Sequence, residues 1–420
     1  MHLSAITAHD VIPALLTALV PPEIHGAAEL AHRAYAGATL AELLAFVDRP
    51  VSDEAGEAAL AFDQALAHRL NFASAFADAL QALALALAQC AVFRIKPGPD
   101  AGTARPLRVL ALVAPGDLMV NTPLEFITRH LDVRLDLLFL RPGRPLPHCV
   151  PDHDVAFFAV SENDPAALRR MRPLFADWPR PVLNDPSALA RLSRDVVASG
   201  LGGLPGIHSP ATRRVPRADL DALALDTPLL IRPVGTHAGD GLAMIEAAAD
   251  LQGTLQGTAA TEFFVTEFVD YRGPDGLFRK YRIAFVNGAP FLCHMALSKH
   301  WMVHYLNAEM SHDPVRRAEE ARAMAEFDSG FARRHAAAFE RLSAWMGLDY
   351  YQIDCAEAPD GRLLVFEADV AAIIHLMDPA DLFPYKPAPM RRAFAAFGDM
   401  LRGAKAARHQ TSLAKAETMV

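Results

Sequence analysis

Three carboxylates near the C-terminal end of the sequence are spaced so that they could hold a divalent cation. Two apolar-rich stretches flank Asp360-Gly361, a dipeptide that favours a two-residue hairpin turn because both central residues need positive φ. A turn centred on this dipeptide places Asp354 directly opposite Glu367. Asp369 lies two residues beyond Glu367, so its side chain shares that face. The spacing predicts three carboxylates on one face of a β-hairpin.

Such a cluster repels itself unless a cation lies within it. Opposed residues of paired strands have Cβ atoms about 5 Å apart. Mg²⁺ commonly combines one or two carboxylates with substrate phosphates, so the cluster predicts a metal site that works with a phosphorylated substrate. A solvated acidic face is the alternative, and the apolar flanks Ile353, Leu364, Val365 and Phe366 favour the buried site. A one-residue bulge in the hairpin would break the assumed register.

A second set of residues could bind phosphate. Arg232 ends an apolar stretch and precedes a loop that contains Gly235, Gly239 and Gly241. Glycines let a backbone approach phosphate oxygens, and a guanidinium offers a planar fork to them. Because most glycine-containing loops are simple turns, this motif gains weight only beside the carboxylate hairpin.

Two further cations, Lys280 and Arg282, fall on one face of a predicted strand that continues into a hairpin turn at Asn287-Gly288. Cations beside a metal and a triphosphate would neutralise charge. The alternative for a basic strand face is ordinary solvation.

The loop that follows this hairpin, residues 298–305, combines Lys299, His300 and His304 with two aromatic residues. A lysine and histidines beside a triphosphate could bind a substrate carboxylate. The alternative is a packed loop in which Trp301 and Tyr305 fill the core.

Composition limits the classes of function. The chain has 420 residues, of which 52% are hydrophobic and 21% charged, so we expect two or three folded domains and no global disorder. The formal net charge of −9 argues against a nucleic-acid partner, which calls for a basic surface.

Cysteine use and hydropathy bear on the compartment. Cys90, Cys149, Cys293 and Cys355 are scattered without a CxxC motif, which indicates a reducing compartment and no structural zinc. The N-terminus lacks the pattern of a signal peptide, and the apolar run Ala79–Val92 is shorter than the ~20 residues that span a bilayer. We therefore expect a cytoplasmic protein without a membrane partner.

Residues 1–95 are rich in Ala and Leu at helical spacing and predict an all-α N-terminal region. We expect helices at Asp10–Leu19, Ile24–Asp48 and Ser52–Ala91, the last one broken near Asn71. This region would form a cap or a homodimer surface, and a peptide-docking module is the alternative.

After a Pro/Gly-rich linker at residues 96–106, strands and helices alternate, which predicts a small open α/β domain over residues 107–203. We expect strands at residues 107–113, 135–140 and 155–160 and helices at 123–130, 168–175 and 188–198.

Residues 204–403 follow an α+β pattern, and residues 404–420 read as a polar, flexible tail. We expect strands at residues 229–232, 263–269, 280–286 and 290–295, and a long helix at 315–346 in two pieces around 328–330.

Taken in order, these parts resemble the ATP-grasp superfamily over roughly residues 107–403. Its members include D-alanine–D-alanine ligase, glutathione synthetase and ligases that add glutamate to protein tails. The resemblance rests on the order of Asn184-Asp185-Pro186, Gly203-Leu204-Pro205, Ile231–Gly241, Phe264–Asp270, Lys280–Arg282, Gln352–Asp354 and Val365–Asp369.

The resemblance implies an ATP-grasp fold, ATP as cosubstrate and roles for particular residues. Glu267, Phe268 and Val269 would frame the adenine. Lys280 and Arg232 would serve the nucleotide phosphates, with Gly235, Gly239 and Gly241 in the covering loop. Arg282 would touch the transferred phosphate, and Asp354, Glu367 and Asp369 would hold two Mg²⁺ ions.

Two departures from the family pattern concern these residues. The superfamily usually has Asn at the position of Asp369 and Lys at the position of Arg232. Asp keeps the ability to bind Mg²⁺ and adds a negative charge, and Arg keeps the cation and changes its geometry. The chain could be a divergent enzyme or an inactive relative.

The resemblance implies an ATP-dependent ligase that joins a small carboxylic acid or peptide to an amine through an acyl phosphate. Arg282, Lys299 and His304 would be its catalytic residues. A small-molecule kinase on the same fold, with His300 or His304 as base, is one alternative. A nucleotide-binding regulatory module is another.

Overall fold

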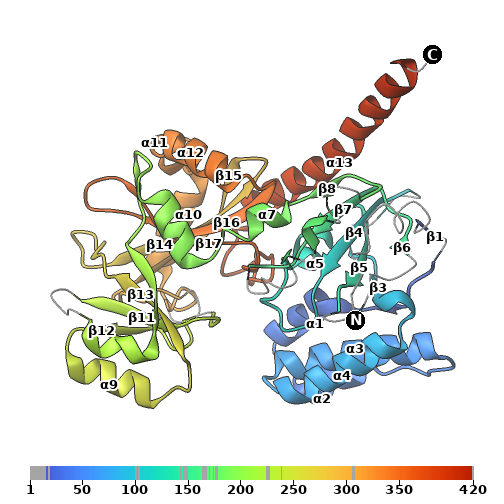
Figure 1. Cartoon of the computed structure of the whole chain (residues 1–420), viewed down its shortest axis with the longest axis horizontal. Coiled ribbons are helices and arrows are strands. Elements are labelled where there is room, and N and C mark those ends of the chain that lie inside the picture. The colour runs from blue at the N-terminus through green and yellow to red at the C-terminus, as the bar shows by residue number, and fades with distance from the viewer. Residues whose placement is uncertain are drawn as a thin grey trace, which may run out of the picture. The chain divides into compact units, whose positions relative to one another are not determined.

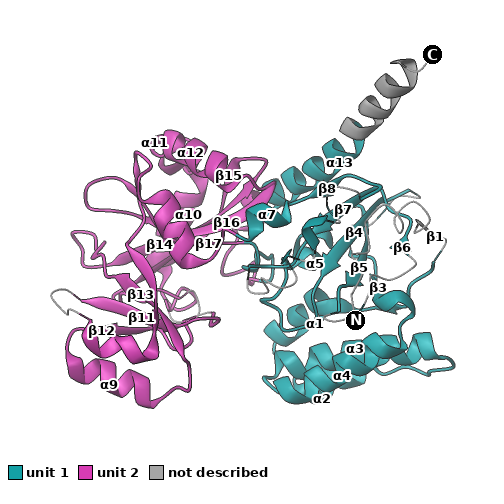
Figure 2. Cartoon of the chain, viewed as in Figure 1, with its two compact units in different colours: residues 1–190, 370–377, 391–420 teal, residues 191–369, 378–390 magenta. Residues whose placement is uncertain are grey.

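The computed structural model divides the chain into two compact units (Figure 2). Unit 1 comprises residues 1–190, 370–377 and 391–420, and unit 2 comprises residues 191–369 and 378–390. The structure describes residues 16–17, 19–99, 102, 105–141, 144, 150–162, 168–169, 171–173, 175, 178–223, 228–237, 239–304 and 308–418, without the side chains of 16–17 and 407–418.

Unit 1 is built on a sheet with the strand order β2-β3-β5-β4-β7-β8 (Figure 1). Strands β5, β4, β7 and β8 run parallel, and β3 pairs antiparallel with β5. The apolar run of β4 is buried almost throughout, as a central parallel strand requires. The strands are β2 Glu23–Ile24, β3 Val92–Ile95, β4 Leu107–Val113, β5 Val133–Phe139, β7 Val155–Phe158 and β8 Val182–Leu183, and β1 Leu16–Thr17 pairs separately with β6 Val150–Pro151.

Helices accompany this sheet. Thr39 and Glu42 form a capping box at the start of α2, and Asp53 caps α3. The helices that hold unit 1 residues are α1 Gly26–Tyr35, α2 Leu40–Val47, α3 Glu54–Leu70, α4 Ser74–Leu87, η2 Gln89–Ala91, α5 Leu124–Thr128, α7 Pro186–Leu189 and α13 Pro387–Thr418, which begins in unit 2.

The prediction of a separate all-α region over residues 1–95 is wrong in two respects. Strands β2 and β3 belong to the sheet of unit 1, so the N-terminal helices share a unit with the α/β part. The helix expected at Ile24–Asp48 is interrupted between α1 and α2, and most of the helix expected at Asp10–Leu19 lies outside the described residues. The break predicted near Asn71 is confirmed, because α3 ends there.

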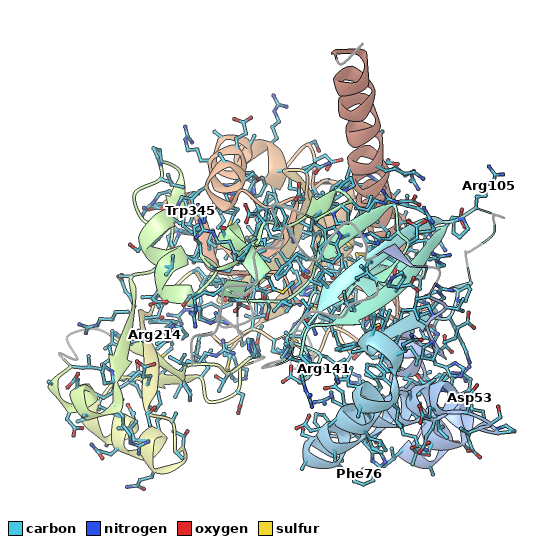
Figure 3. The ribbon with its side chains drawn as sticks, turned by 45° about the vertical axis from the view of Figure 1, so that its right-hand side comes forward. Asp53, Phe76, Arg105, Arg141, Arg214 and Trp345 are labelled. Carbon is cyan, nitrogen blue, oxygen red and sulfur yellow. The ribbon has the colours of Figure 1, made fainter. Side chains whose placement is uncertain are left out.

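Helix α4 carries apolar side chains on its exposed face. Phe76 and Leu83 are 55% and 44% exposed, and Phe72, in the turn before the helix, is 94% exposed. Phe76 lies at the surface of the helical layer (Figure 3). This face is where the expected homodimer surface would lie, and that expectation stays a prediction.

Unit 2 contains a five-stranded sheet with the order β15-β14-β16-β17-β9. The turn between β14 and β15 is the predicted one: Asn287 and Gly288 have φ of 47° and 77°, and Val286 pairs with Ala289. The strands are β9 Ile207–His208, β14 Phe278–Val286, β15 Ala289–Ser298, β16 Tyr350–Glu357 and β17 Leu363–Asp369.

A second, four-stranded sheet of unit 2 has the order β10-β13-β11-β12 and is antiparallel throughout. A small core of buried residues that includes Ile231, Ile245 and Phe263 stabilises it. Its elements are β10 Thr212–Pro216, η3 Arg217–Ala222, β11 Leu229–Pro233, β12 Ala243–Ile245, α9 Ala248–Gln256 and β13 Glu262–Glu267.

Along the chain, the remaining helices of unit 2 lie before β9 or between β15 and β16. The predicted long helix is broken near residues 328–330, as expected. These helices are α8 Arg194–Leu201, α10 Pro314–Ala325, α11 Phe331–Arg334 and α12 Ala336–Met346.

Two findings bear on the compartment. Cys90 is disulfide-bonded, whereas Cys293 and Cys355 are free and buried. The expectation of reduced cysteines is therefore wrong at Cys90, and the cysteine pattern no longer favours a reducing compartment. Among the described residues, no helix is both long and apolar enough to cross a membrane.

Candidate functional site

The β16–β17 hairpin brings two of the predicted carboxylates face to face. Its register pairs Asp354 with Glu367, as the sequence predicted. The register arises differently, because closer to the turn Cys355 pairs with Val365 and the alignment shifts by one residue at a β-bulge. The bulge that would have broken the predicted register instead produces it, since the turn itself is longer than two residues.

Asp354 is the centre of an ion-pair network. Arg282 pairs with it across β14 and β16, and its Nε and Nη2 donate to Oδ1 and Oδ2 at 2.8 and 3.0 Å. Lys280 Nζ donates to Oδ2 at 2.9 Å. The Asp354 side chain is only 4% exposed. Burial opposes its ionisation, but the attraction of Arg282 and Lys280 outweighs burial and holds the pKa of Asp354 well below its ordinary value.

Glu367 has a cationic partner of its own, Arg194, with which it forms an ion pair. Burial would raise the pKa of Glu367, but the attraction of Arg194, Arg232 and Lys280 together outweighs this effect and the pKa is lowered. The metal prediction started from carboxylates without counter-ions. Asp354 and Glu367 do repel each other, but cations already pair with both, so the cluster is not uncompensated. In the described part of the chain, no three His, Cys, Asp or Glu side chains form a ready-made metal cage.

Sequence reasoning missed Arg194, which begins α8. Arg214 on β10, labelled in Figure 3, contacts both neighbours of Arg194. Its Nη2 donates to Ser193 Oγ at 3.2 Å, and its Nε lies 3.6 Å from Asp195 Oδ2. The ring of Trp345, also labelled in Figure 3, packs against α8. The only signal for Arg194 in the sequence is its place in the helix before the Gly-Leu-Pro turn.

Arg232 is buried at the end of β11 with part of its guanidinium unsatisfied. The residue is 7% exposed, and its Nε donates to Thr236 Oγ1 at 3.1 Å. Its Nη2 is buried, and no residue in the described part of the chain accepts a hydrogen bond from it. Burial, and then the charge of Arg194, lower the pKa of Arg232 to about 10. A buried cationic N–H without an acceptor is costly, so this position suits an anion.

The loop after Arg232 joins β11 to β12 and contains the three predicted glycines. Gly235, Gly239 and Gly241 have φ of 87°, 82° and 64°. A Cβ on Gly241 would lie 2.8 Å from Pro233 Cδ, so this close approach requires glycine. The Thr236 hydroxyl lies 3.0 and 2.8 Å from the carbonyl oxygens of Pro233 and Asp240 and holds the two sides of the loop together.

The expected adenine hinge lies at the end of β13, which stops at Glu267, two residues before the predicted end. Glu267 is exposed, whereas Phe268 and Val269 are half-buried and pack against an apolar cluster. Buried members of that cluster include Tyr271, Phe278, Met295 and Leu364.

The predicted acceptor loop divides into two parts. His304 is half-buried, and its pKa is lowered by burial first and then by Lys280 and Arg282, so it lies within the field of the cation cluster. Lys299 is exposed and follows Ser298, which lies four strand positions, roughly 14 Å, from the His294 position opposite Arg282. His300 is exposed, and Tyr305 lies outside the described residues.

His294 is a second residue that sequence reasoning missed. A β-bulge beside Arg282 shifts the β14–β15 register and places His294, rather than Cys293, opposite Arg282. Burial, and then the charges of Arg282 and Lys386, hold the pKa of His294 well below its ordinary value. The network continues into Lys386, which is buried and bonds Asp378 at 2.8 Å.

No family model matches this chain, and no curated protein matches it. Among solved structures, it is similar to the D-alanine–D-alanine ligase of Bacillus anthracis complexed with ATP, at 12% identity and a TM-score of 0.42, over 73% of this chain and 99% of that one. It is similar to the VanG D-Ala:D-Ser ligase of Enterococcus faecalis, at 13% identity and a TM-score of 0.44, over 72% and 100%.

A further similar structure is a RimK domain protein, described as ATP-grasp, from Sphaerobacter thermophilus, at 15% identity and a TM-score of 0.40, over 70% of this chain and 99% of that one.

Proposed function

We propose that this chain is an ATP-dependent carboxylate–amine ligase. The observation that carries the proposal is the gathering of Arg194, Arg232, Lys280 and Arg282 around Asp354 and Glu367 in unit 2. No described residue accepts a hydrogen bond from Arg232 Nη2. With Asp369, whose charge also acts on Arg282, four cations face three carboxylates, which leaves excess positive charge for a polyphosphate. The glycine loop beside Arg232 could cover its phosphates.

The residues take distinct parts in binding. Arg232 Nη2 would donate to a nucleotide phosphate, and Lys280 and Arg282 would face the transferred phosphoryl group. The half-buried Phe268 and Val269 after β13 would frame the adenine. Each interaction places charge or apolar surface where ATP needs it, and none requires a nucleophile from the protein.

Asp354, Glu367 and Asp369 would hold Mg²⁺, and they fit it in donor type. All three offer carboxylate oxygens, and Mg²⁺ typically takes one or two carboxylates plus phosphates instead of an all-protein cage. The pairing of Asp354 with cations leaves room for this mode at Oδ1, which accepts one hydrogen bond and retains a further lone pair, whereas Oδ2 accepts two. When bound, the ions would neutralise charge on the triphosphate.

The reaction would proceed in two balanced steps. A substrate carboxylate oxygen attacks the γ-phosphorus of ATP, the bond to ADP breaks, and an acyl phosphate forms. The amine nitrogen then attacks the acyl carbon, phosphate leaves with the bonding electron pair, and the nitrogen loses a proton. His304 is the described imidazole of the acceptor loop that lies in the field of Lys280 and Arg282, and it could take that proton.

Release of ADP and phosphate from ATP across pools of carboxylic acids tests this proposal. Hydroxylamine traps acyl phosphates, so it should stimulate release with the correct acid and leave a hydroxamate. A stable phosphoester without free phosphate would instead identify a kinase. Nucleotide binding without turnover in any pool would identify a binding module, and absence of nucleotide binding would contradict all three readings.

A further inference from the structure

The loop at residues 299–304 connects three parts of the proposed nucleotide site. We propose that Trp301 and Met302 link recognition of the nucleotide base to closure of the glycine loop. This proposal rests on the proposed function. In this role Trp301 and Met302 sense the nucleotide, while His304 at the end of the same loop keeps its proposed part in the chemistry.

Trp301 contacts the adenine hinge. Its ring centroid lies 6.1 Å from that of Phe268, at an interplanar angle of 81°. Its carbonyl oxygen accepts a hydrogen bond from Tyr271 Oη at 3.3 Å. One apolar cluster contacts the hinge residues Phe268 and Val269 and also Trp301. Val303 is a buried member of that cluster. A base that enters beside Phe268 therefore meets the Trp301 side of the loop.

Met302 contacts the glycine loop. Its Sδ lies 3.5 Å from the position that a Cβ on Gly239 would occupy, which is van der Waals distance. Gly239 has φ of 82° and lies between Thr236 and the start of β12. The Thr236 hydroxyl donates to the Asp240 carbonyl oxygen and so joins the two sides of the loop around Gly239. Movement of the glycine loop towards phosphate therefore changes its packing on Met302.

His304 completes the connection at the phosphate end, because the charges of Lys280, Arg282 and Asp354 all act on it. The chain between Trp301 and His304 is short, and Val303 anchors it in the core. An effect on Trp301 thus reaches Met302 and Gly239 through adjacent residues of one anchored loop.

The linkage has a thermodynamic consequence. A ligand shifts the equilibrium of the glycine loop only through its different affinities for the open and closed states. A purine nucleoside triphosphate contacts both the hinge and the glycine loop, whereas inorganic tripolyphosphate contacts only the phosphate end. We therefore expect a nucleotide that carries the base to populate the closed state of the glycine loop more than the phosphates alone do.

Hydrogen exchange of residues 234–242 in the full chain measures this closure. With Mg²⁺ present, the non-hydrolysable analogue AMP-PNP should protect these amides at least 5-fold more than tripolyphosphate at equal occupancy. In Met302→Ala, AMP-PNP should still bind within about 3-fold of the wild-type affinity, but its protection should fall to the tripolyphosphate level. Met119→Ala in unit 1 is the matched control and should retain wild-type protection.

Tryptophan fluorescence gives a second readout. The chain has three tryptophans, and Trp178 and Trp345 are packed elsewhere, so AMP-PNP should change the emission of the wild type and not that of Trp301→Phe. The proposal is overturned if tripolyphosphate and AMP-PNP protect the loop equally in the wild type, or if Met302→Ala keeps full protection. Calorimetry that detects no AMP-PNP binding to the wild type would instead refute the nucleotide site itself.

Discussion

Arg282 and Asp354 face each other across β14 and β16 and are joined by two hydrogen bonds of 2.8 and 3.0 Å. This pair lies in the sheet interior, where Asp354 is the shared counter-ion of Arg282 and Lys280. It therefore has a structural role before any ligand binds. The simple picture of a repulsive acidic cluster, relieved by losing a carboxylate, does not apply to Asp354.

We expect Asp354→Asn to lower the stability of the ligand-free protein by roughly 3–5 kcal/mol, because it leaves the half-buried cations Lys280 and Arg282 without their buried counter-ion. The urea midpoint of unit 2, followed without nucleotide, measures the effect. Asp360→Asn, in the exposed turn of the same hairpin, is the control and should change little. An unchanged midpoint for Asp354→Asn would contradict the network.

Glu367→Gln should remove Mg²⁺-dependent ATP turnover with little loss of stability, because its partner Arg194 is one-quarter exposed and can be solvated. ADP release at saturating Mg²⁺ measures the change. Glu357→Gln on the same hairpin, whose partners are Arg334 and His335, should retain turnover. Full turnover in Glu367→Gln would show that this carboxylate is not a metal ligand.

Arg232→Ala should weaken ATP binding by roughly 1.5–3 kcal/mol, the range for a hydrogen bond to a charged group. Calorimetry with AMP-PNP measures the loss. Arg213→Ala, an exposed cation of the same sheet, tests whether general charge explains the effect. Equal losses in both variants, or none in Arg232→Ala, would remove Arg232 from the phosphate site.

The two ends of the loop after β15 should differ in function. His304 lies in the field of the cation cluster, whereas Lys299 follows Ser298 at the end of β15, four strand positions from His294. We therefore expect His304→Ala to abolish substrate-stimulated ADP release while sparing ATP binding. Lys299→Ala should have a smaller effect on that release, although the sequence predicts both as catalytic. Loss of thermal stability with normal kinetics in His304→Ala would make its role structural.

A pH effect is expected in unit 1 at Glu125, whose carboxylate accepts a hydrogen bond from the Ala28 backbone at 3.2 Å. Burial is the main cause that raises its pKa from 4.5 to about 7. The folded state therefore holds a proton that the unfolded state releases, and stability falls as pH rises from about 4.5 to about 7.

By the linkage relation, ionisation of Glu125 should lower the free energy of unfolding by roughly 3 kcal/mol at most. Urea midpoints at pH 5 and pH 8 measure it. The difference between these pH values should be smaller in Glu125→Gln, which cannot ionise. An identical pH response in the two proteins would place the pKa of Glu125 near its ordinary value.

Much of the local structure could be predicted because it depends on short-range chemistry. Asn287-Gly288 accommodates positive φ and so defines the β14–β15 turn. The pairing of Asp354 with Glu367 was predicted from a two-residue turn, whereas the folded hairpin reaches the same pairing through a longer turn and a β-bulge. The prediction of an all-helical N-terminus failed because β2 and β3 are too short to show alternation. Only their pairing in the folded sheet, β2 with β3 and β3 with β5, identifies them as strands.

The sequence by itself determined which side chains of the site exist and on which strands they lie. Only the tertiary structure decided their partners. Arg194 meets Glu367, and His294 meets Arg282, through a helix position and a β-bulge that no local pattern encodes. The physical reason is that bulges and contacts between distant segments are selected by packing of the whole unit, where the cost of burying each charge is offset by a partner far along the chain.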